Sequence, residues 1–352
     1  MSEIKVLIVD DSLLTRKVLS GIIKKTPELV LAGTANDGKY ALAKIPFLKP
    51  DIITLDVNMP KLDGIATLQE IMRRFPMPVI MVSAVTKQAA TETITALEAG
   101  AVDFITKPES DKDIEKIENL LVEKIKAATK FKINAVKPRE KVDRIRVFDA
   151  PQIRVDTTKK FANKVVAIGI STGGPKALKE IFIKNLDPSL AILVVQHMPD
   201  TFTGAFAARL NQISNLNIKE AEDNDPIIEG HVYIAPGHSH MEIRKLNGNF
   251  YIKLTTGEKV SGHKPSADVL FKSAAQSFGN KSVAVIMTGM GRDGADGTVE
   301  IKNKHGFTIA QDDKTSVVFG MNKEAISLGS IDFVLPLDEI SEKFTEIYKN
   351  KL

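Results

Sequence analysis

A buried strand that runs directly into a glycine-lined turn is the feature that most constrains this chain. Residues 165–170 read Val-Val-Ala-Ile-Gly-Ile, and Ser171-Thr-Gly-Gly follows at once. The apolar run has no polar alternation, which is typical of a strand covered on both faces of a parallel sheet. Open α/β sheets place their chemistry at the carboxyl ends of such strands. The spacing Gly169-x-Ser171-x-Gly173 fits a nucleophile elbow, so we expect the Ser171 hydroxyl to project from a sharp turn.

Strand-like and helix-like segments alternate along most of the sequence. Expected strands lie at 5–9, 29–35, 51–55, 79–82, 102–105, 165–170, 191–195, 231–235 and 282–287. The segments 241–246 and 250–255 flank Asn247-Gly248-Asn249, a strong hairpin signal. The fold class is therefore α/β, with two doubly wound parallel-sheet domains. We expect the first to be flavodoxin-like and the second to be Rossmann-like with an antiparallel hairpin.

Length and composition narrow the class of protein. A chain of 352 residues is too long for one ordinary core. The absence of cysteine excludes a disulfide framework, thiolate catalysis and a cysteine-based zinc site. The first residues enter a strand without a cleavable apolar segment, and no apolar run approaches the ~20 residues that span a bilayer. We therefore expect a cytoplasmic protein that is not embedded in a membrane.

A basic segment separates the two halves. Residues 121–160 hold eight lysines and four arginines against five acidic residues, a net charge of +7 in a chain whose total is +4. Such a segment can attract nucleic acid or can serve as a solvated linker. Apolar periodicity fades after Ala127 and the rest of the chain is net acidic, which favours a linker and no nucleic-acid partner. We predict domains at 1–126 and 161–352, joined by a basic linker at 127–160.

The first half places charged and polar groups at the ends of its predicted strands. In chain order these groups are Asp10, Asp11, Asp56, Ser83 and Lys107. Each alone is an ordinary loop residue, but in a parallel sheet all of them meet at one edge. Three adjacent carboxylates repel one another unless a cation lies among them, and oxygen ligands suit Mg²⁺. A carboxylate there can attack phosphorus, Lys107 can pair with phosphoryl oxygens, and Ser83 can donate a hydrogen bond to one.

Residues 3–126 resemble the receiver domain of two-component response regulators. The matching motifs are Val9-Asp-Asp-Ser12, Leu55-Asp-Val-Asn-Met-Pro60, Ser83-Ala84 and Thr106-Lys-Pro108. The resemblance implies that Asp56 is the phospho-acceptor. It also implies that Asp11, Asp56 and the Asn58 carbonyl hold Mg²⁺, with Asp10 acting through water. Phe104 stands where the family's switch tyrosine is commoner, so the hydroxyl of that tyrosine is missing here.

Ser171 needs a general base and a group that holds the base. Of the six histidines, His197 follows a predicted strand directly and so belongs to the same sheet edge as Ser171. Asp293 lies in the glycine-rich loop after strand 282–287, again on that edge, and Asp296 is its rival. The chain order Ser, His, Asp differs from those of chymotrypsin, subtilisin and the α/β-hydrolases, which argues against those folds.

Other interpretations of these residues remain open. Ser171 could cap the following helix, or its loop could cradle a phosphate. The loop lacks both the G-x-G-x-x-G spacing and the Gly-Lys-Ser/Thr of nucleotide sites. His238 and His240 alternate at strand spacing and could form a metal pair, but no third ligand has suitable spacing. We expect no metal and no other cofactor in the second half.

Residues 161–352 resemble the catalytic domain of the chemotaxis protein-glutamate methylesterases. The matching stretches are Ile168-Gly-Ile-Ser-Thr-Gly-Gly-Pro, Gln196-His-Met-Pro, Val232-Tyr-Ile-Ala-Pro-Gly, His263-Lys-Pro-Ser-Ala-Asp-Val-Leu-Phe and Thr288-Gly-Met-Gly-Arg-Asp-Gly-Ala. The family's serine, histidine and aspartate fall on Ser171, His197 and Asp293. Ile170 stands where alanine is common, and the linker is unusually basic.

The resemblance implies an enzyme that removes methyl esters from chemoreceptor glutamates, releases methanol and also deamidates receptor glutamines. We expect the Met290 amide, and secondarily the Thr172 amide, to bind the oxyanion. A chemotaxis histidine kinase is the implied phosphodonor, and phosphorylation of Asp56 is expected to relieve inhibition by the receiver. The rival hypotheses are a DNA-binding regulator, a nucleotide-dependent oxidoreductase and a non-catalytic scaffold. The second half shows no helix-turn-helix pattern.

Overall fold

The computed structural model describes residues 3–108, 111–130 and 160–350. The chain divides into two compact units. The described part of the first unit ends at residue 130, and that of the second begins at residue 160. Most of the predicted linker thus lies outside the described residues, although helix α5 continues to Lys130, four residues into it. Within the described residues, no helix is both long and apolar enough to cross a membrane.

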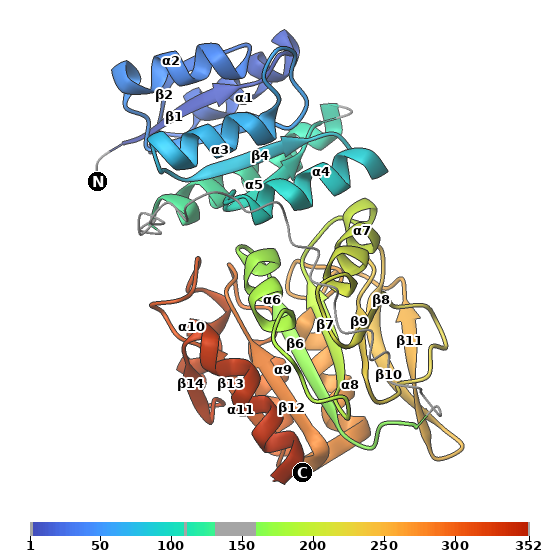
Figure 1. Ribbon diagram of the computed structural model, residues 1–352. Helices are drawn as coiled ribbons and strands as arrows, with labels where there is room; N and C mark the ends of the chain where they lie inside the picture. The colour runs from blue at the N-terminus through green and yellow to red at the C-terminus, as the bar shows by residue number, and fades with distance from the viewer. Residues whose placement is uncertain (1–2, 109–110, 131–159, 351–352) are drawn as a thin grey trace. The chain divides into compact units, whose positions relative to one another are not determined.

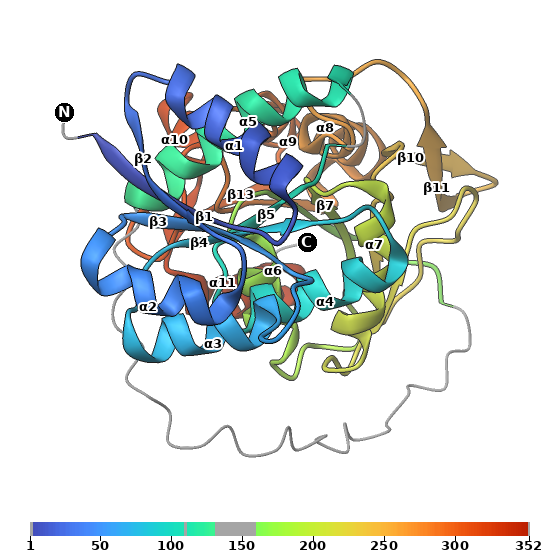
Figure 2. The ribbon, with the colours of Figure 1, turned by 90° about the horizontal axis from the view of Figure 1, so that it is seen from above.

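The first unit is a five-stranded parallel sheet in the order β2-β1-β3-β4-β5. Its strands are β1 (Ile4–Val9), β2 (Leu29–Ala35), β3 (Ile52–Asp56), β4 (Val79–Ser83) and β5 (Asp103–Thr106). Its helices are α1 (Leu13–Lys25), α2 (Gly38–Leu48), α3 (Gly64–Arg74), α4 (Lys87–Glu98) and α5 (Asp111–Lys130). Helices α1 and α5 cover one face of the sheet, and α2, α3 and α4 cover the other (Figure 2).

Local sequence determines where the helices of this unit begin. Ser12, Asp37, Asp63 and Thr86 are N-caps whose side chains accept a hydrogen bond from a backbone amide in the first turn. The chain order reverses beside β1, which pairs with both β2 and β3. The carboxyl ends of β1 and β3 therefore flank a crevice of the kind in which open α/β sheets bind ligands.

The second unit is a seven-stranded parallel sheet in the order β14-β13-β12-β6-β7-β9-β8. Its strands are β6 (Val165–Ile170), β7 (Ala191–Gln196), β8 (Asn217–Glu220), β9 (His231–Ile234), β12 (Ser282–Ile286), β13 (Phe307–Gln311) and β14 (Phe333–Leu335). Its helices are α6 (Gly174–Phe182), α7 (Asp200–Asn211), α8 (Ala267–Phe278), α9 (Ala295–Asn303), α10 (Met321–Ser327) and α11 (Leu337–Asn350), with a 3-10 turn at Gly279–Lys281. Helices α6 and α11 lie in front of the sheet and α8 and α9 behind it (Figure 1).

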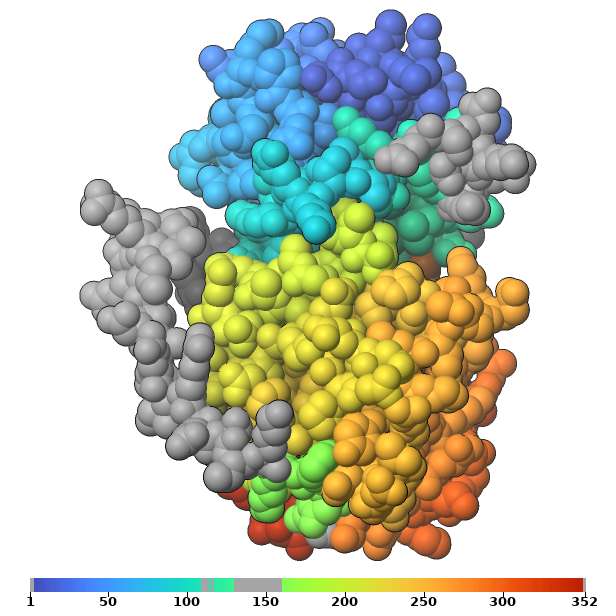
Figure 3. Space-filling model, turned by 90° about the vertical axis from the view of Figure 1, so that its right-hand side faces the viewer, coloured from blue at the N-terminus to red at the C-terminus, as the bar shows by residue number. Residues whose placement is uncertain are grey.

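A separate antiparallel hairpin packs against helix α8. Strands β10 (His240–Leu246) and β11 (Asn249–Thr255) are joined by Asn247 and Gly248, whose φ angles of 50° and 83° fit the predicted tight turn. The ring of Phe250 stacks on Phe278 of α8 with centroids 3.9 Å apart. In the space-filling view, the yellow-to-orange region that includes this hairpin forms a continuous outer face of the second unit (Figure 3).

Helix α8 lies close to the central strand because Gly169 has no side chain. A Cβ on Gly169 would come within 2.6 Å of the Ala267 Cβ and 3.0 Å of the Phe271 ring. All of strand β6 is buried, and Phe271 is fully buried against it. This contact brings the first turn of α8 to the carboxyl edge of the sheet, where the predicted site lies.

The structure confirms the predicted α/β class, the two parallel sheets and the hairpin. Strand β8, strand β14, helix α10 and the 3-10 turn at Gly279–Lys281 were not predicted. The sequence pattern predicts helices over 176–184 and 298–305, whereas α6 begins two residues earlier at Gly174 and α9 three residues earlier at Ala295.

Candidate active site

The three predicted catalytic residues lie on adjacent loops at one edge of the second sheet. Ser171 follows β6, His197 follows β7 and Asp293 follows β12, and β6 pairs with both of the other strands. The backbone holds these loops together, because the His197 amide donates to the Ile170 carbonyl at 3.0 Å and the Ser171 amide donates to the Thr288 carbonyl at 3.0 Å. Backbone hydrogen bonds therefore hold the loop that carries Ser171 next to the loop that carries His197, its predicted base.

His197 and Asp293 form a buried hydrogen-bonded pair. The His197 Nε2 atom lies 2.8 Å from Asp293 Oδ2, and the histidine and aspartate side chains are 8% and 0% exposed. The other ring nitrogen, Nδ1, is buried and has no hydrogen-bond partner among the described residues. With Nε2–H donated to the carboxylate, Nδ1 carries the free lone pair, so it is the atom available to accept a proton from Ser171.

The Asp293 carboxylate is held ionised by several donors. Burial by itself would raise its pKa, but hydrogen bonds from His197, Ser266 and the Ala267 amide outweigh burial, and the pKa of Asp293 lies below its usual value. Its position at the first turn of the twelve-residue helix α8 adds the favourable end of the helix dipole. A carboxylate that stays charged can stabilise an imidazolium on His197.

A second histidine covers one face of the His197 ring. The imidazole of His263 stacks on His197 with centroids 3.9 Å apart and an interplanar angle of 8°. Burial, and then the neighbouring charge of His197, lower the pKa of His263 to about 4, so it is neutral near pH 7. His197, His263 and Asp293 have potential ligand atoms within 4.8 Å of one another. However, nearly parallel rings direct their in-plane lone pairs side by side rather than at one ion, so this geometry does not favour a shared metal.

Gln196 fastens the turn that carries the serine. Its Nε2 donates to the Ser171 carbonyl at 3.0 Å and to the His197 carbonyl at 3.2 Å. Thr288 also holds this turn, because its hydroxyl donates a hydrogen bond to the Thr172 carbonyl at 2.9 Å. Sequence reasoning did not assign a role to Gln196, although its place directly before His197 was a signal that could have suggested one.

The amides of Met290 and Thr172, predicted as oxyanion donors, donate no hydrogen bond within the part of the chain that the structure describes. The Gly289 carbonyl accepts from the amides of Gly320 and Met321 at 3.0 and 2.9 Å. Because the C=O and N–H of a trans peptide point in opposite directions, this clamp also fixes the direction of the Met290 N–H. A Cβ on Gly289 would lie 2.8 Å from the Ser171 Cβ, so the clamped peptide borders the nucleophile.

The geometry does not support three of the alternative interpretations of the second half: Ser171 as a helix cap, Asp296 as the third member and a metal pair of His238 and His240. Gly173 rather than Ser171 is the N-cap of α6, and it has a left-handed φ of 80°. Asp296 pairs with Arg292 at 2.7 Å on the exposed surface and so is not the third catalytic member. His238 pairs with Asp200 at 2.6 Å, whereas both nitrogens of the buried His240 contact other backbone groups, which separates the two histidines as metal ligands.

The first unit gathers its predicted acidic residues around a lysine. Lys107 Nζ lies 2.7 Å from Asp56 Oδ2 and 3.1 Å from Asp10 Oδ2, and both carboxylates are almost fully buried. Asp11 is exposed, yet it offers a carboxylate oxygen within 4.8 Å of oxygens from Asp10 and Asp56. The Asn58 amide donates to Asp56 Oδ1 at 3.2 Å, and its carbonyl accepts no hydrogen bond from the described residues.

Burial raises the pKa of Asp56 to about 6 and also raises the pKa of Asp10. Lys107 opposes these shifts, and its own pKa is raised because its two carboxylate partners outweigh its burial. Three carboxylates with one ammonium form an electron-rich oxygen cluster, and such a donor set fits a hard divalent cation. Asp10, Asp11, Asp56 and the Asn58 carbonyl therefore fit the predicted Mg²⁺ site.

The two predicted switch residues of the first unit are buried. The Thr93 hydroxyl on helix α4 donates to Ser83 Oγ at 2.7 Å. Because Ser83 is the acceptor in this contact, it keeps a proton of its own to donate. Phe104 is 4% exposed, and the Lys124 ammonium lies 5.5 Å from its ring centroid. The side chain at this position is therefore held by packing and a cation–π contact.

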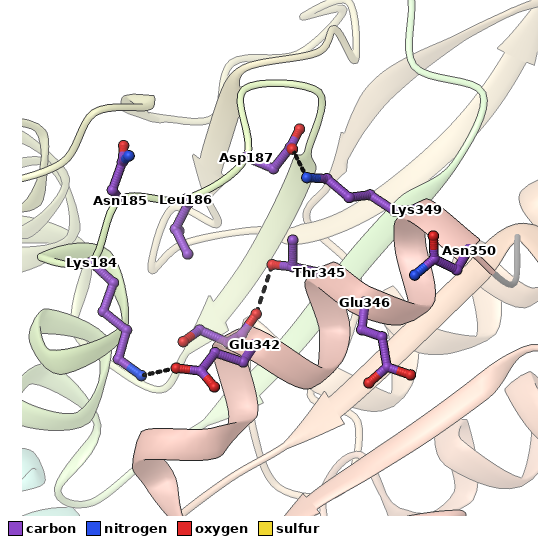
Figure 4. Close-up of a pocket in the computed structure, with 10 residues that line it drawn as sticks. Lys184, Asn185, Leu186, Asp187, Glu342, Thr345, Glu346, Lys349 and Asn350 are labelled. Atoms are coloured by element: carbon purple, nitrogen blue, oxygen red, sulfur yellow. Dashed lines mark hydrogen bonds and ion pairs between the residues drawn. The ribbon is translucent and has the colours of Figure 1, made fainter.

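A surface hollow of about 420 Å³ lies at the opposite, amino-terminal edge of the second sheet (Figure 4). It is lined by Lys184, Asn185, Leu186, Asp187, Ser341, Glu342, Thr345, Glu346, Lys349 and Asn350. Ion pairs join Lys184 to Glu342 and Lys349 to Asp187 across it. Helix α6 leads away from Ser171 toward this edge, so the hollow does not belong to the catalytic site.

Comparison with known proteins identifies the family of each half of the chain. The CheB methylesterase family model matches residues 166–344, and the response regulator receiver domain model matches residues 6–118. The chain is 47% identical to a protein-glutamate methylesterase/protein-glutamine glutaminase of Pyrococcus horikoshii, over 97% of this chain and 92% of the relative. A protein of the same name from Sulfurimonas denitrificans is 44% identical, over 99% of each chain.

The second unit is also similar to a solved structure. The crystal structure of the Thermotoga maritima CheB methylesterase catalytic domain is 44% identical in sequence and has a TM-score of 0.51. The match covers 52% of this chain and 98% of that one.

We predict that Gly320→Ala lowers methyl-ester hydrolysis about 100-fold, the typical effect of losing one oxyanion donor. A Cβ at position 320 would lie 2.6 Å from the Gly289 oxygen and 3.1 Å from the Met290 Cα, so it pushes the clamped peptide out of place. The measurement is methanol release at saturating substrate. Gly257→Ala is the matched control, because its Cβ meets open space. Equal activity of the two variants would contradict the clamp.

We also predict that Mg²⁺ binding to the first unit weakens as the pH falls through 6. Mg²⁺ binds the ionised carboxylate, and a pKa of about 6 means that Asp56 holds a proton below that pH. The dissociation constant should be about tenfold higher at pH 5 than at pH 7.5. Calorimetric titration with MgCl₂ checks this. In Asp56→Asn, the part of the pH dependence that comes from protonation of Asp56 should be lost. An affinity that is the same at both pH values would refute the assignment.

Proposed function

Because this chain belongs to the CheB methylesterase family, we propose that Ser171, His197 and Asp293 are its catalytic residues. The chain is a protein-glutamate methylesterase/protein-glutamine glutaminase with a receiver domain. Its substrates are then glutamate methyl esters and glutamines of chemoreceptors. The observation that carries the assignment is the buried His197–Asp293 pair. The Nδ1 atom of His197 has no hydrogen-bond partner among the described residues, and His197 lies on the loop next to the one that carries Ser171.

The reaction begins with attack by Ser171 Oγ on the ester carbonyl carbon. His197 Nδ1 takes the hydroxyl proton as the new C–O bond forms, and Asp293 stabilises the resulting imidazolium. The oxyanion receives hydrogen bonds from the Met290 amide, with the Thr172 amide as the second donor. When the tetrahedral intermediate collapses, its bond to the methoxy oxygen breaks and His197 returns the proton to that oxygen, which leaves as methanol.

Water then completes the cycle. His197 Nδ1 accepts a proton from a water molecule that attacks the acyl-serine, and the proton passes to Ser171 Oγ as the ester bond to the enzyme breaks. The product is a free glutamate. A glutamine amide follows the same sequence, with ammonia in place of methanol as the first leaving group. One site therefore accounts for both activities named in the relatives.

Control is assigned to the first unit. We propose that Asp56 accepts a phosphoryl group from a chemotaxis histidine kinase and that Lys107 pairs with the phosphoryl oxygens. Mg²⁺, held by Asp10, Asp11, Asp56 and the Asn58 carbonyl, would neutralise charge during this transfer. Phosphorylation is proposed to raise esterase activity. A cytoplasmic location follows from this proposal, because the kinase and the methylated receptor helices are expected there.

The direct test measures methanol released from methylated receptor membranes. Wild-type protein should release methanol, and release should rise when a small phosphodonor and Mg²⁺ are added. Ser171→Ala should abolish release under both conditions, because no nucleophile remains. Asp56→Asn should keep the basal rate and lose the response to phosphodonor. No release from the wild type would refute the esterase assignment, and a phosphodonor response in Asp56→Asn would refute the regulatory one.

A further inference from the structure

The carboxylate of Asp293 is held mainly by a segment that lies 25–27 residues earlier in the chain. The Ser266 hydroxyl donates to Asp293 Oδ1 at 2.6 Å. The Ala267 amide donates to Oδ2 at 2.7 Å, and the Asp268 amide donates to Oδ1 at 3.2 Å. Oδ2 also faces His197, so the two carboxylate oxygens have different tasks. Oδ2 serves the proposed catalytic histidine and is also held by the Ala267 amide, whereas Oδ1 is held by the Ser266 hydroxyl and the Asp268 amide.

Ser266 is itself fixed from behind. It is fully buried, and its amide donates to Nδ1 of the buried His240 at 3.2 Å. The Nε2 of His240 lies 2.8 Å from the Glu258 carbonyl, so Nε2 carries the ring proton and Nδ1 is the acceptor. A chain of contacts thus runs from the hairpin strand β10 through Ser266 to the catalytic pair.

The hydroxyl proton of Ser266 has one destination. Its oxygen accepts the Val269 amide at 3.4 Å as the N-cap of α8, and an ionised carboxylate can only accept. The 2.6 Å contact is therefore a charge-assisted hydrogen bond from the hydroxyl to Asp293, and it is the shortest of the donors to this carboxylate. The Asp268 amide, at 3.2 Å, is the other donor to Oδ1 and is a weaker anchor.

We propose that Ser266 is a positioning residue of the esterase site. Its hydroxyl sets the rotation of the Asp293 carboxylate so that Oδ2 stays directed at His197 Nε2. This proposal rests on the proposed role of Ser171, His197 and Asp293. Without the Ser266 hydroxyl, Oδ1 keeps only the weaker Asp268 amide among its donors in the described residues, so the carboxylate is aligned less firmly and stabilises the imidazolium less.

The kinetic signature follows from this role. Ser266 does not touch the substrate in this mechanism, so its loss should lower kcat and leave KM nearly unchanged. Removal of an outer partner of a site residue typically costs 10- to 100-fold, and about that loss is expected for Ser266→Ala. Because a poorly aligned carboxylate stabilises the imidazolium less, the acid limb of the pH–rate profile should move to lower pH. A purely structural role would leave that limb in place.

The test uses the full-length protein and methanol release from methylated receptor membranes between pH 5.5 and 9. Ser266→Ala is the primary variant. Ser266→Asn and Ser266→Asp form a matched pair of equal size, and both can cap α8. Only asparagine brings an N–H donor to Asp293, so at pH 8 it should retain at least tenfold more activity than the aspartate variant. Ser273→Ala is the control and should keep the wild-type pH profile. Ser273 is a buried serine of α8 that donates to the Leu270 carbonyl and accepts from the Ile243 amide, and it does not contact Asp293 in the described structure.

Two outcomes would overturn the proposal. One is a wild-type kcat and acid limb in Ser266→Ala, and the other is equal activity of the Asn and Asp variants. Circular dichroism and thermal melting show whether each variant folds, and Ser266→Ala decides the question if the larger side chains do not fit. Failure of the esterase assignment looks different: wild-type protein releases no methanol, or Ser171→Ala still does, and the role of Ser266 then falls with it.

Discussion

The proposed catalytic arrangement depends on one carboxylate that stays charged while fully buried. An isolated buried carboxylate would take up a proton, because desolvation disfavours its ionised form. Asp293 avoids this through donors from His197, Ser266 and the first amides of α8. The donors from Ser266 and α8 can reach it because α8 approaches β6 at Gly169, where a side chain would collide with Ala267. The packing of one helix on one strand therefore contributes to keeping Asp293, the proposed partner of the general base, ionised.

In the acidic cluster of the first unit, burial of a carboxylate has the opposite outcome, because the pKa of Asp56 is raised whereas that of Asp293 is lowered. Asp56 is also buried, but it has few donors and a second carboxylate beside it, so its pKa rises to about 6. The hydrogen bond and charge of Lys107 lower the pKa of Asp56, but by less than burial raises it. Binding of a divalent cation in place of the proton would stabilise the ionised cluster. In the proposed function, the Asp293 carboxylate is thus fixed for catalysis, whereas the Asp56 carboxylate accepts a phosphoryl group.

Strand-end reasoning identified Ser171, His197 and Asp293 because buried parallel strands are easy to recognise and their carboxyl ends meet at one edge. The family matches confirm the fold and the activity, and the roles of the individual residues remain predictions. Ser266 and Gly320 were missed because their importance comes from tertiary contacts: an N-cap serine and a loop glycine look ordinary in sequence. Helix α10 and strands β8 and β14 were missed because segments of three to seven residues carry little periodicity.

The most direct test of the catalytic assignment is covalent labelling of the full-length protein with a fluorophosphonate, followed by mass spectrometry of its peptides. This reagent reports whether a serine has been made nucleophilic by a neighbouring base. The assigned triad predicts a single adduct on Ser171 that forms much more slowly in His197→Gln. An adduct on another residue, or an unchanged labelling rate in His197→Gln, would contradict it.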